Sequence, residues 1–132
     1  MKAIKARMTR ALNVGTRLEC ADNSGAKVIE IISVMGYHGV KRRQPAAGVG
    51  YMIKATVKEG DVKVRKTLVN AVIIRQKAEY RRKDGMRVGF EDNAAVVTDD
   101  TGVPKGTEIK GPVAKEAVER YSMLGKISSM VV

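Results

Sequence analysis

The sequence predicts a mainly β protein: a small closed β-barrel with a short helical tail at its C-terminus. Three observations lead to this fold class. Strand-like segments alternate between apolar and polar residues, glycine-containing turns separate them, and a helical pattern occurs only near the end of the chain. We expect closure into a barrel because it removes the exposed edges that an open sheet of short strands would carry.

The clearest strand signal covers residues 51–58. Its expected buried positions recur every second residue, at Tyr51, Ile53, Ala55 and Val57. Val62 and Val64 then alternate with basic residues, and EGD at 59–61 is predicted to be the turn of a β-hairpin.

Three further segments are rich in branched aliphatic residues and favour strands. They are AKVIEIISVMG at 26–36, KTLVNAVIIRQK at 66–77 and the shorter NAAVV at 93–97. Together with the segments above, they predict five or six strands.

The only convincing helical pattern is GPVAKEAVERY at 111–121. Pro112 suits the first helical position, because it has no N–H to leave unpaired. Glu116 and Arg120 have the spacing of a favourable i,i+4 pair. One face of this helix is expected to carry Val113, Ala117 and Tyr121.

ADNSG at 21–25 lies between two apolar runs and is predicted to be a structural turn formed by Asp22, Asn23, Ser24 and Gly25. Asp and Asn side chains can bond back to the main chain, and glycine adopts positive φ freely. A catalytic use of Asp22 or Ser24 would need a base, and the single histidine, His38, cannot be assigned that role from sequence.

Length and composition indicate one globular domain. The chain has 132 residues, with 44% hydrophobic and 30% charged residues, so it has enough apolar content to fold. We expect a basic N-terminal extension at 1–15, the barrel at 16–105 and the helical tail at 106–132.

The net charge of +11 is unevenly distributed along the chain. Residues 1–90 carry 20 Lys and Arg against 7 Asp and Glu, whereas residues 91–132 carry 5 against 7. This asymmetry indicates a part that binds a polyanion, most often a nucleic acid. The alternative is a basic surface kept for solubility, but such surfaces normally mix both signs.

Several other classes of protein are not expected. No apolar run approaches the ~20 residues that span a bilayer, and the basic start lacks the apolar core of a secretory signal. A transit peptide is an alternative reading of this acid-free start, and a nucleic-acid arm is preferred. The lone Cys20 excludes an internal disulfide and a cysteine-based zinc site, consistent with a reducing cytoplasm. GVG at 48–50 precedes a strand and is no dinucleotide motif. We predict no enzyme activity, cofactor, metal ion or small-molecule substrate.

A longer pattern is similar to that of a known family. ADNSGAK, the basic GVKRRQPAAGVG and GTEIKGPVAKE accompany a spaced motif. The motif comprises Ala71, Val72, Ile73, Ile74, nine residues, Asp84, Gly85, four residues, Phe90, two residues, Asn93, two residues, Val96 and Val97. From about Thr16 onward the chain resembles the universal large-subunit ribosomal protein fourteen family. Its N-terminal extension and the loop at EGDVKVRK resemble the archaeal branch.

The resemblance implies a five-stranded barrel with a helical tail, placed in the large ribosomal subunit in the cytoplasm. It also implies binding to large-subunit ribosomal RNA and to neighbouring ribosomal proteins. Further implied partners are small-subunit ribosomal RNA at an intersubunit bridge and initiation factor six, which docks on such proteins to block subunit joining.

The charge distribution supports RNA binding independently of the resemblance. Residues 41–87 hold 14 Lys and Arg against 4 Asp and Glu. Aromatic residues, at 4%, are too few for a platform that stacks single-stranded bases, so folded RNA contacted through its backbone is the expected target. The predicted RNA-binding residues are Lys41, Arg42, Arg43, Lys63, Arg65, Lys66, Arg75, Lys77, Arg81, Arg82, Lys83 and Arg87.

The neutral tail is expected to dock a protein instead. The predicted docking residues are Val113, Glu116, Arg120, Met123 and Leu124. An open alternative is that Met123, Leu124, Ile127 and Met130 cap the barrel core.

Two other functions agree with part of the sequence. A DNA-binding architectural barrel would explain the charge but neither the neutral tail nor the matched motif. A nuclease would need clustered carboxylates for metal ions, and the pairs Glu91–Asp92 and Asp99–Asp100 resemble turn residues instead.

Overall fold

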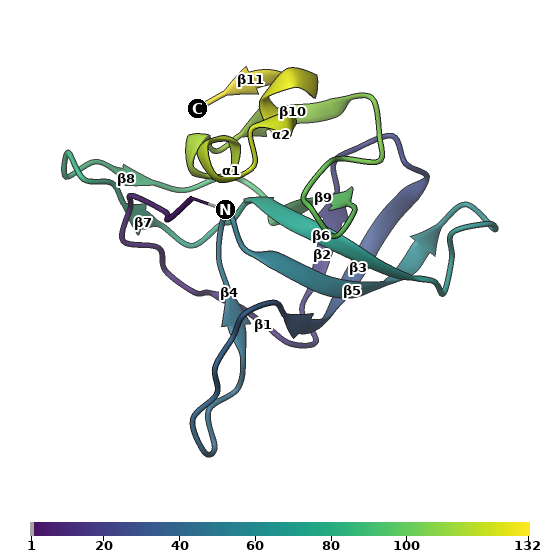
Figure 1. Cartoon of the computed structure of the whole chain (residues 1–132), viewed down its shortest axis with the longest axis horizontal. Helices are drawn as coiled ribbons and strands as arrows, with labels where there is room; N and C mark the ends of the chain where they lie inside the picture. The colour runs from purple at the N-terminus through teal and green to yellow at the C-terminus, as the bar shows by residue number, and fades with distance from the viewer. Residues whose placement is uncertain (1) are drawn as a thin grey trace.

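The structure is a computed structural model that describes residues 2–132. Its centre is a closed barrel of five strands (Figure 1): β2 (Arg17–Cys20), β3 (Ala26–Val34), β5 (Met52–Gly60), β6 (Leu68–Arg75) and β9 (Ala94–Thr98). Neighbouring strands are antiparallel, except that β2 and β9 close the barrel in parallel. The predicted fold class is confirmed.

Shorter elements surround the barrel. β1 (Leu12–Asn13) pairs with β4 (Ala46–Ala47), and β7 (Tyr80–Arg81) pairs with β8 (Arg87–Val88). The tail consists of β10 (Ile109–Val113), α1 (Lys115–Arg120), α2 (Met123–Ile127) and β11 (Ser128–Val131). No helix within residues 2–132 is both long and apolar enough to cross a membrane.

The two-residue period of β5 places its side chains as predicted from Ile53 onward, whereas Tyr51 lies before the strand and is only partly buried, and Met52 is buried. Ile53, Ala55 and Val57 are fully buried, whereas Lys54 and Lys58 are exposed. β6 differs, because the run 71–75 is buried on both faces. The tail covers its outer face, where the N–H of Ala114 donates to the carbonyl of Ile74 at 3.2 Å. Burial on both faces explains the unbroken aliphatic run.

The predicted hairpin strand at 62–64 is wrong. β5 continues to Gly60, and the chain then makes a series of turns over 61–67 before β6 begins. The carbonyl of Asp61 accepts the N–H groups of Val64 and Arg65, and the side chain of Val62 is 84% exposed. The prediction relied on two valines at alternate positions, as in a strand, but of these two only Val64 packs against the core.

The predicted helix start is also wrong. Pro112 lies in β10, next to Gly111 with φ +78°, and α1 begins only at Lys115. β11, which the sequence did not predict, runs parallel to β10. The carboxylate of Glu116 does not pair with Arg120 but with Arg82, at 2.7 Å. These contacts involve residues distant in sequence, which local patterns cannot reveal.

ADNSG forms the predicted turn between β2 and β3. Gly25 has φ +99°, and the buried Asp22 accepts hydrogen bonds from the backbone N–H of Ser24 at 3.3 Å and its hydroxyl at 2.7 Å. The other carboxylate oxygen of Asp22 accepts the N–H of Val97 at 3.0 Å. Asp22 therefore ties the turn to β9.

Candidate nucleic-acid interface

Most of the predicted RNA-binding residues lie on three segments that leave the barrel in different directions. In Figure 1 the 35–45 loop projects at the bottom, the 61–67 loop at the right and the 80–88 hairpin, built on β7 and β8, at the left. The exposed basic residues on these segments are Lys41, Arg42, Arg43, Lys63, Arg65, Lys66, Arg81, Lys83 and Arg87. None of them forms a salt bridge with another of residues 2–132.

Two of these cations occupy costly backbone conformations. Arg42 and Lys66 have φ of 68° and 64°, the left-handed region that glycine and asparagine adopt more readily. Each residue lies in a tight part of its loop: the N–H of Lys66 donates to the carbonyl of Val57 at 2.9 Å. Since glycine would make these turns at lower cost, the basic side chains contribute something other than stability.

Arg75 does not belong to this exposed set. It is 7% exposed, and its guanidinium makes two hydrogen bonds to Asp92, at 2.8 and 3.1 Å. It also donates to the carbonyls of Lys110 at 3.0 Å and Pro112 at 2.7 Å. Hydrogen bonds from Arg75 lower the pKa of Asp92. The predicted RNA contact at Arg75 is thus replaced by a structural role, in which it fastens β10 to the barrel.

Arg82 is likewise engaged within the protein. Its side chain is 11% exposed, and it donates to the carboxylate of Glu116 at 2.7 Å and to the backbone oxygen of Val132 at 2.7 Å. Burial alone would raise the pKa of Glu116, but hydrogen bonds from Arg82 and Tyr80 outweigh it and hold that pKa below its usual value. Arg82 therefore joins the 80–88 hairpin to the tail. Lys77, another predicted RNA-binding residue, is exposed.

The predicted docking residues also divide into buried and exposed side chains. Val113, Glu116 and Leu124 are buried, so they cannot present a docking surface. For Leu124 the alternative of a core cap is correct. Arg120 is partly exposed, with its guanidinium over the ring of Tyr51 at 5.7 Å, and Met123 is exposed. The exposed apolar side chains of the tail are Met123, Met130, Val131 and Val132.

A hollow that the sequence did not reveal lies between the 35–45 loop and the tail. It has a volume of about 710 Å³ and brings together three of the four tyrosines with basic side chains. Its aromatic and basic lining residues are Arg10, Tyr37, His38, Tyr51, Arg120 and Tyr121. Low aromatic content alone could not predict this grouping, because the tyrosines are far apart in sequence.

Groups that could act in catalysis are not arranged for it. Burial, followed by the negative charge of Asp22, raises the pKa of Cys20 to about 12, so the thiol stays protonated. His38 lies in the 35–45 loop and lines the hollow, whereas Cys20 ends β2. Within residues 2–132 no three His, Cys, Asp or Glu side chains are grouped closely enough to hold a metal ion.

Comparison with known proteins places these features in a family. The family model described as Ribosomal protein L14p/L23e matches residues 11–132. Proteins named large ribosomal subunit protein uL14 from Methanothrix thermoacetophila and Methanoregula boonei are each 56% identical to this chain over 132 residues, covering all of both chains. The protein of that name from Methanospirillum hungatei is 51% identical over the same span.

The match covers the barrel, the 80–88 hairpin and the tail, and the relatives match the N-terminal residues as well. The resemblance inferred from ADNSGAK and the spaced motif is confirmed. The chain belongs to the ribosomal protein L14p/L23e family, whose members are structural ribosomal proteins and not enzymes.

Proposed function

We propose that this protein is a structural constituent of the large ribosomal subunit that binds large-subunit ribosomal RNA through the 35–45 loop, the 61–67 loop and the 80–88 hairpin. The names of the full-length relatives support the placement in the large subunit. The observation that carries the RNA part is the set of exposed cations on these segments, which have no acidic partner within residues 2–132. Five of these nine cations are arginines, whose planar guanidinium suits phosphate.

The directions of the three segments favour folded RNA over a single strand. A protein that follows one strand concentrates its cations along one groove. Here the basic segments leave the barrel at its bottom, left and right in Figure 1, so they reach phosphates on several sides. The protein would be held within folded RNA by its backbone rather than by its base sequence.

The experiment is filter binding to a large-subunit ribosomal RNA transcript at several salt concentrations. Release of counterions from about six to ten phosphate contacts predicts a roughly 10³- to 10⁵-fold loss of affinity between 50 and 200 mM salt. The loop variant, Arg43→Gln with Arg65→Gln and Arg81→Gln, removes one cation from each segment. It should reduce the slope of log affinity against log salt by roughly two to three.

A matched control has the same change in charge elsewhere. The tail variant, Lys110→Gln with Lys115→Gln and Lys126→Gln, removes three exposed cations from the part of the chain that is not basic overall. It should bind with nearly the parental slope. A salt-independent affinity of the parent, or equal losses in the two variants, would contradict RNA binding through the loops.

The remaining proposed roles are contacts with protein partners and with the small ribosomal subunit at an intersubunit bridge. We propose that the tail docks initiation factor six through Met123, Met130, Val131 and Val132, supported by their exposure on a tail that is close to neutral, with four Lys and Arg against three Glu in residues 106–132. The family resemblance supports contacts with neighbouring ribosomal proteins and with small-subunit ribosomal RNA at an intersubunit bridge. A ribosome-bound protein of this kind would act in the cytoplasm.

A further inference from the structure

Three arginines stand side by side where the N-terminal residues meet the 80–88 hairpin. Arg7 forms an antiparallel bridge with Arg81, in which its N–H donates to the carbonyl of Arg81 at 3.1 Å. On its other side Arg81 is paired with Arg87. Directly paired residues of neighbouring strands project from the same face, so the three side chains form a row across three strands.

The N-terminal residues that supply Arg7 are fixed in place. The hydroxyl of Thr9 donates to the carbonyl of Glu79 at 2.9 Å, and the side-chain amide of Gln76 donates to the carbonyl of Thr9 at 3.1 Å. A Cβ on Gly48 would lie 2.7 Å from Met8 and from the carbonyl of Thr9, so this glycine makes room for the arm. The arginine row is therefore built before any ligand arrives.

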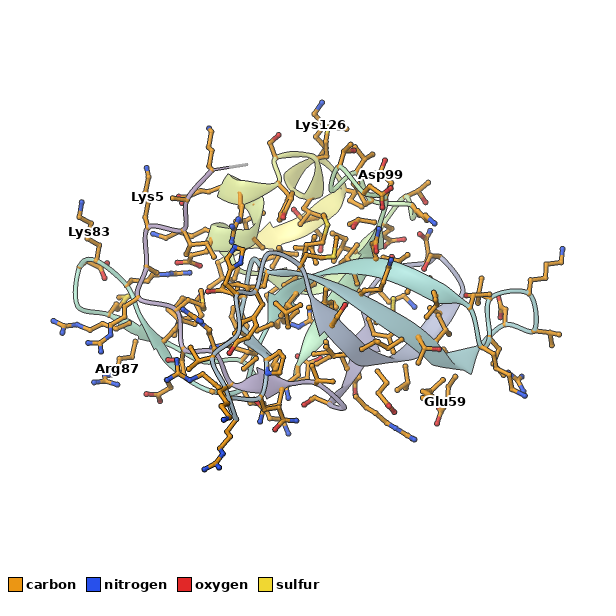
Figure 2. The ribbon with its side chains drawn as sticks, turned by 60° about the horizontal axis from the view of Figure 1, so that its bottom comes forward. Lys5, Glu59, Lys83, Arg87, Asp99 and Lys126 are labelled. Carbon is orange, nitrogen blue, oxygen red and sulfur yellow. The ribbon has the colours of Figure 1, made fainter. Side chains whose placement is uncertain are left out.

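The surface beside this row is concave and wholly basic. A groove of about 270 Å³ is lined by Lys5, Arg7, Arg81, Arg82 and Lys83. Figure 2 shows Lys5, Lys83 and Arg87 at the end of the molecule where the hairpin projects. Arg82 is neutralised by Glu116, but the other cations have no ion pair among residues 2–132.

Such a row costs the fold free energy, since like charges placed directly opposite each other on neighbouring strands repel. Without a bound ligand, the arginines at positions 7, 81 and 87 would repel one another and would not stabilise the fold. A surface kept only for solubility mixes acids with bases, yet no acidic side chain lines this groove. A bound anion would turn the repulsion into attraction.

We propose that Arg7, Arg81 and Arg87, flanked by Lys5 and Lys83, form a binding site for adjacent phosphates of the RNA backbone, with the N-terminal arm as the third strand of the site. Guanidinium groups bind phosphate oxygens in pairs, and the row presents several to one stretch of backbone. The site contacts phosphates only, so it adds affinity and register rather than base specificity. This inference rests on the proposed binding of ribosomal RNA.

The test uses full-length Arg7→Gln, which removes the charge but keeps the backbone bond to Arg81. In filter binding to a large-subunit ribosomal RNA transcript, loss of one phosphate contact should reduce the salt slope by about 0.7 to 0.9. Between 50 and 200 mM salt, this amounts to about a threefold smaller change in affinity than in the parent. Arg87→Gln should reduce the salt slope by the same amount. The control is Lys126→Gln, which removes one positive charge from the tail (Figure 2).

A second readout separates a binding role from a structural one. Without RNA and at low salt, Arg7→Gln should melt at the same temperature as the parent or above it, because one repulsion has been removed. A lower melting temperature would assign Arg7 to the fold and overturn the inference. Parental affinity and slope in both arginine variants, or equal losses with Lys126→Gln, would overturn it as well. If the parent itself fails to bind the transcript, the proposed function fails with it.

Discussion

At the scale of single residues, the turn at 21–25 shows how a short polar segment can fix a barrel. Asp22 is buried, and its carboxylate joins the turn to Val97 of β9. Gly25 has φ +99°, and a Cβ there would lie 2.8 Å from the carboxylate of Asp61. The positive φ therefore favours glycine, whereas the exposed Asp61 side chain can move away from a Cβ.

Gly25→Val should reduce the free energy of unfolding by about 1 to 3 kcal/mol, because a branched side chain at positive φ is strained. Ser24→Ala is the control. It removes one hydrogen bond to Asp22 but keeps the backbone conformation, and should cost about 1 kcal/mol or less. Urea unfolding of both variants measures the difference, and equal midpoints for Gly25→Val and the parent would contradict the account of the turn.

The turn was predictable because the Asp, Asn and Gly residues that form it act on their own backbone. Arg75 was not, because its environment depends on Asp92 and on carbonyls of β10 that are 35 residues or more away. A lone arginine at the end of a strand has the same sequence signature whether it faces RNA or the interior. The exposed cations of the 41–43 and 63–66 clusters lie in loops, although the alternation at 62–65 predicted a strand there, and their contacts with RNA stay a prediction.

At the scale of elements, the tail is joined to the 80–88 hairpin by one buried ion pair. The side chains of Arg82 and Glu116 are 11% and 2% exposed, and the hydroxyl of Tyr80 donates to Glu116 at 2.7 Å. Arg82 also holds the last residue of the chain, because it donates to the backbone oxygen of Val132. This cluster sets where the hairpin, and the cations on it, stand relative to the barrel.

Glu116→Gln should destabilise the protein by about 3 kcal/mol at neutral pH, because it leaves Arg82 buried without its counter-charge. Since the pKa of Glu116 is lowered on folding, its contribution is present above the unfolded value of 4.5 and is lost as pH falls through the folded pKa. The gap in melting temperature between parent and variant should therefore narrow below pH 4.5. Glu119→Gln, on the exposed side of α1, is the control and should change little. A gap that does not depend on pH would contradict the ion-pair account.

Docking at the tail is tested best by point substitutions. Truncation after Tyr121 would remove the buried Leu124 and the strand that pairs with β10, so it would damage the fold itself. Met123→Ser with Met130→Ser changes only exposed side chains. It should weaken binding of initiation factor six by about tenfold or more and leave the melting temperature unchanged. Calorimetry that finds parental affinity would exclude this surface.

The elements were predictable where a period or a run was long. β3, β5, β6 and β9 follow from alternation or aliphatic runs, and the barrel follows from their number. β11 was missed because its four residues are largely exposed and acquire order only by pairing with β10. Pro112 was misplaced because the same proline that favours a helix start also fits an irregular strand, here beside Gly111.

At the scale of the whole molecule, a closed barrel carries basic segments outward on three sides, and the tail adds a surface that is close to neutral (Figure 1). Affinity for RNA therefore comes from the sum of separate contacts around the barrel, not from one site. Loss of one segment should weaken binding without abolishing it. Loss of a cation from every segment should exclude the protein from ribosomes in competition with the parent.

The most direct test is a competition in cells. Parent and loop variant are expressed in equal amounts with distinguishable tags, and the ratio of the two proteins is measured in salt-washed large ribosomal subunits. The account predicts that the loop variant is depleted at least about tenfold relative to the parent, as expected from three lost phosphate contacts, whereas the tail variant is retained. Equal incorporation of the loop variant and the parent, with equal melting temperatures, would contradict the claim that these basic segments bind the protein to ribosomal RNA.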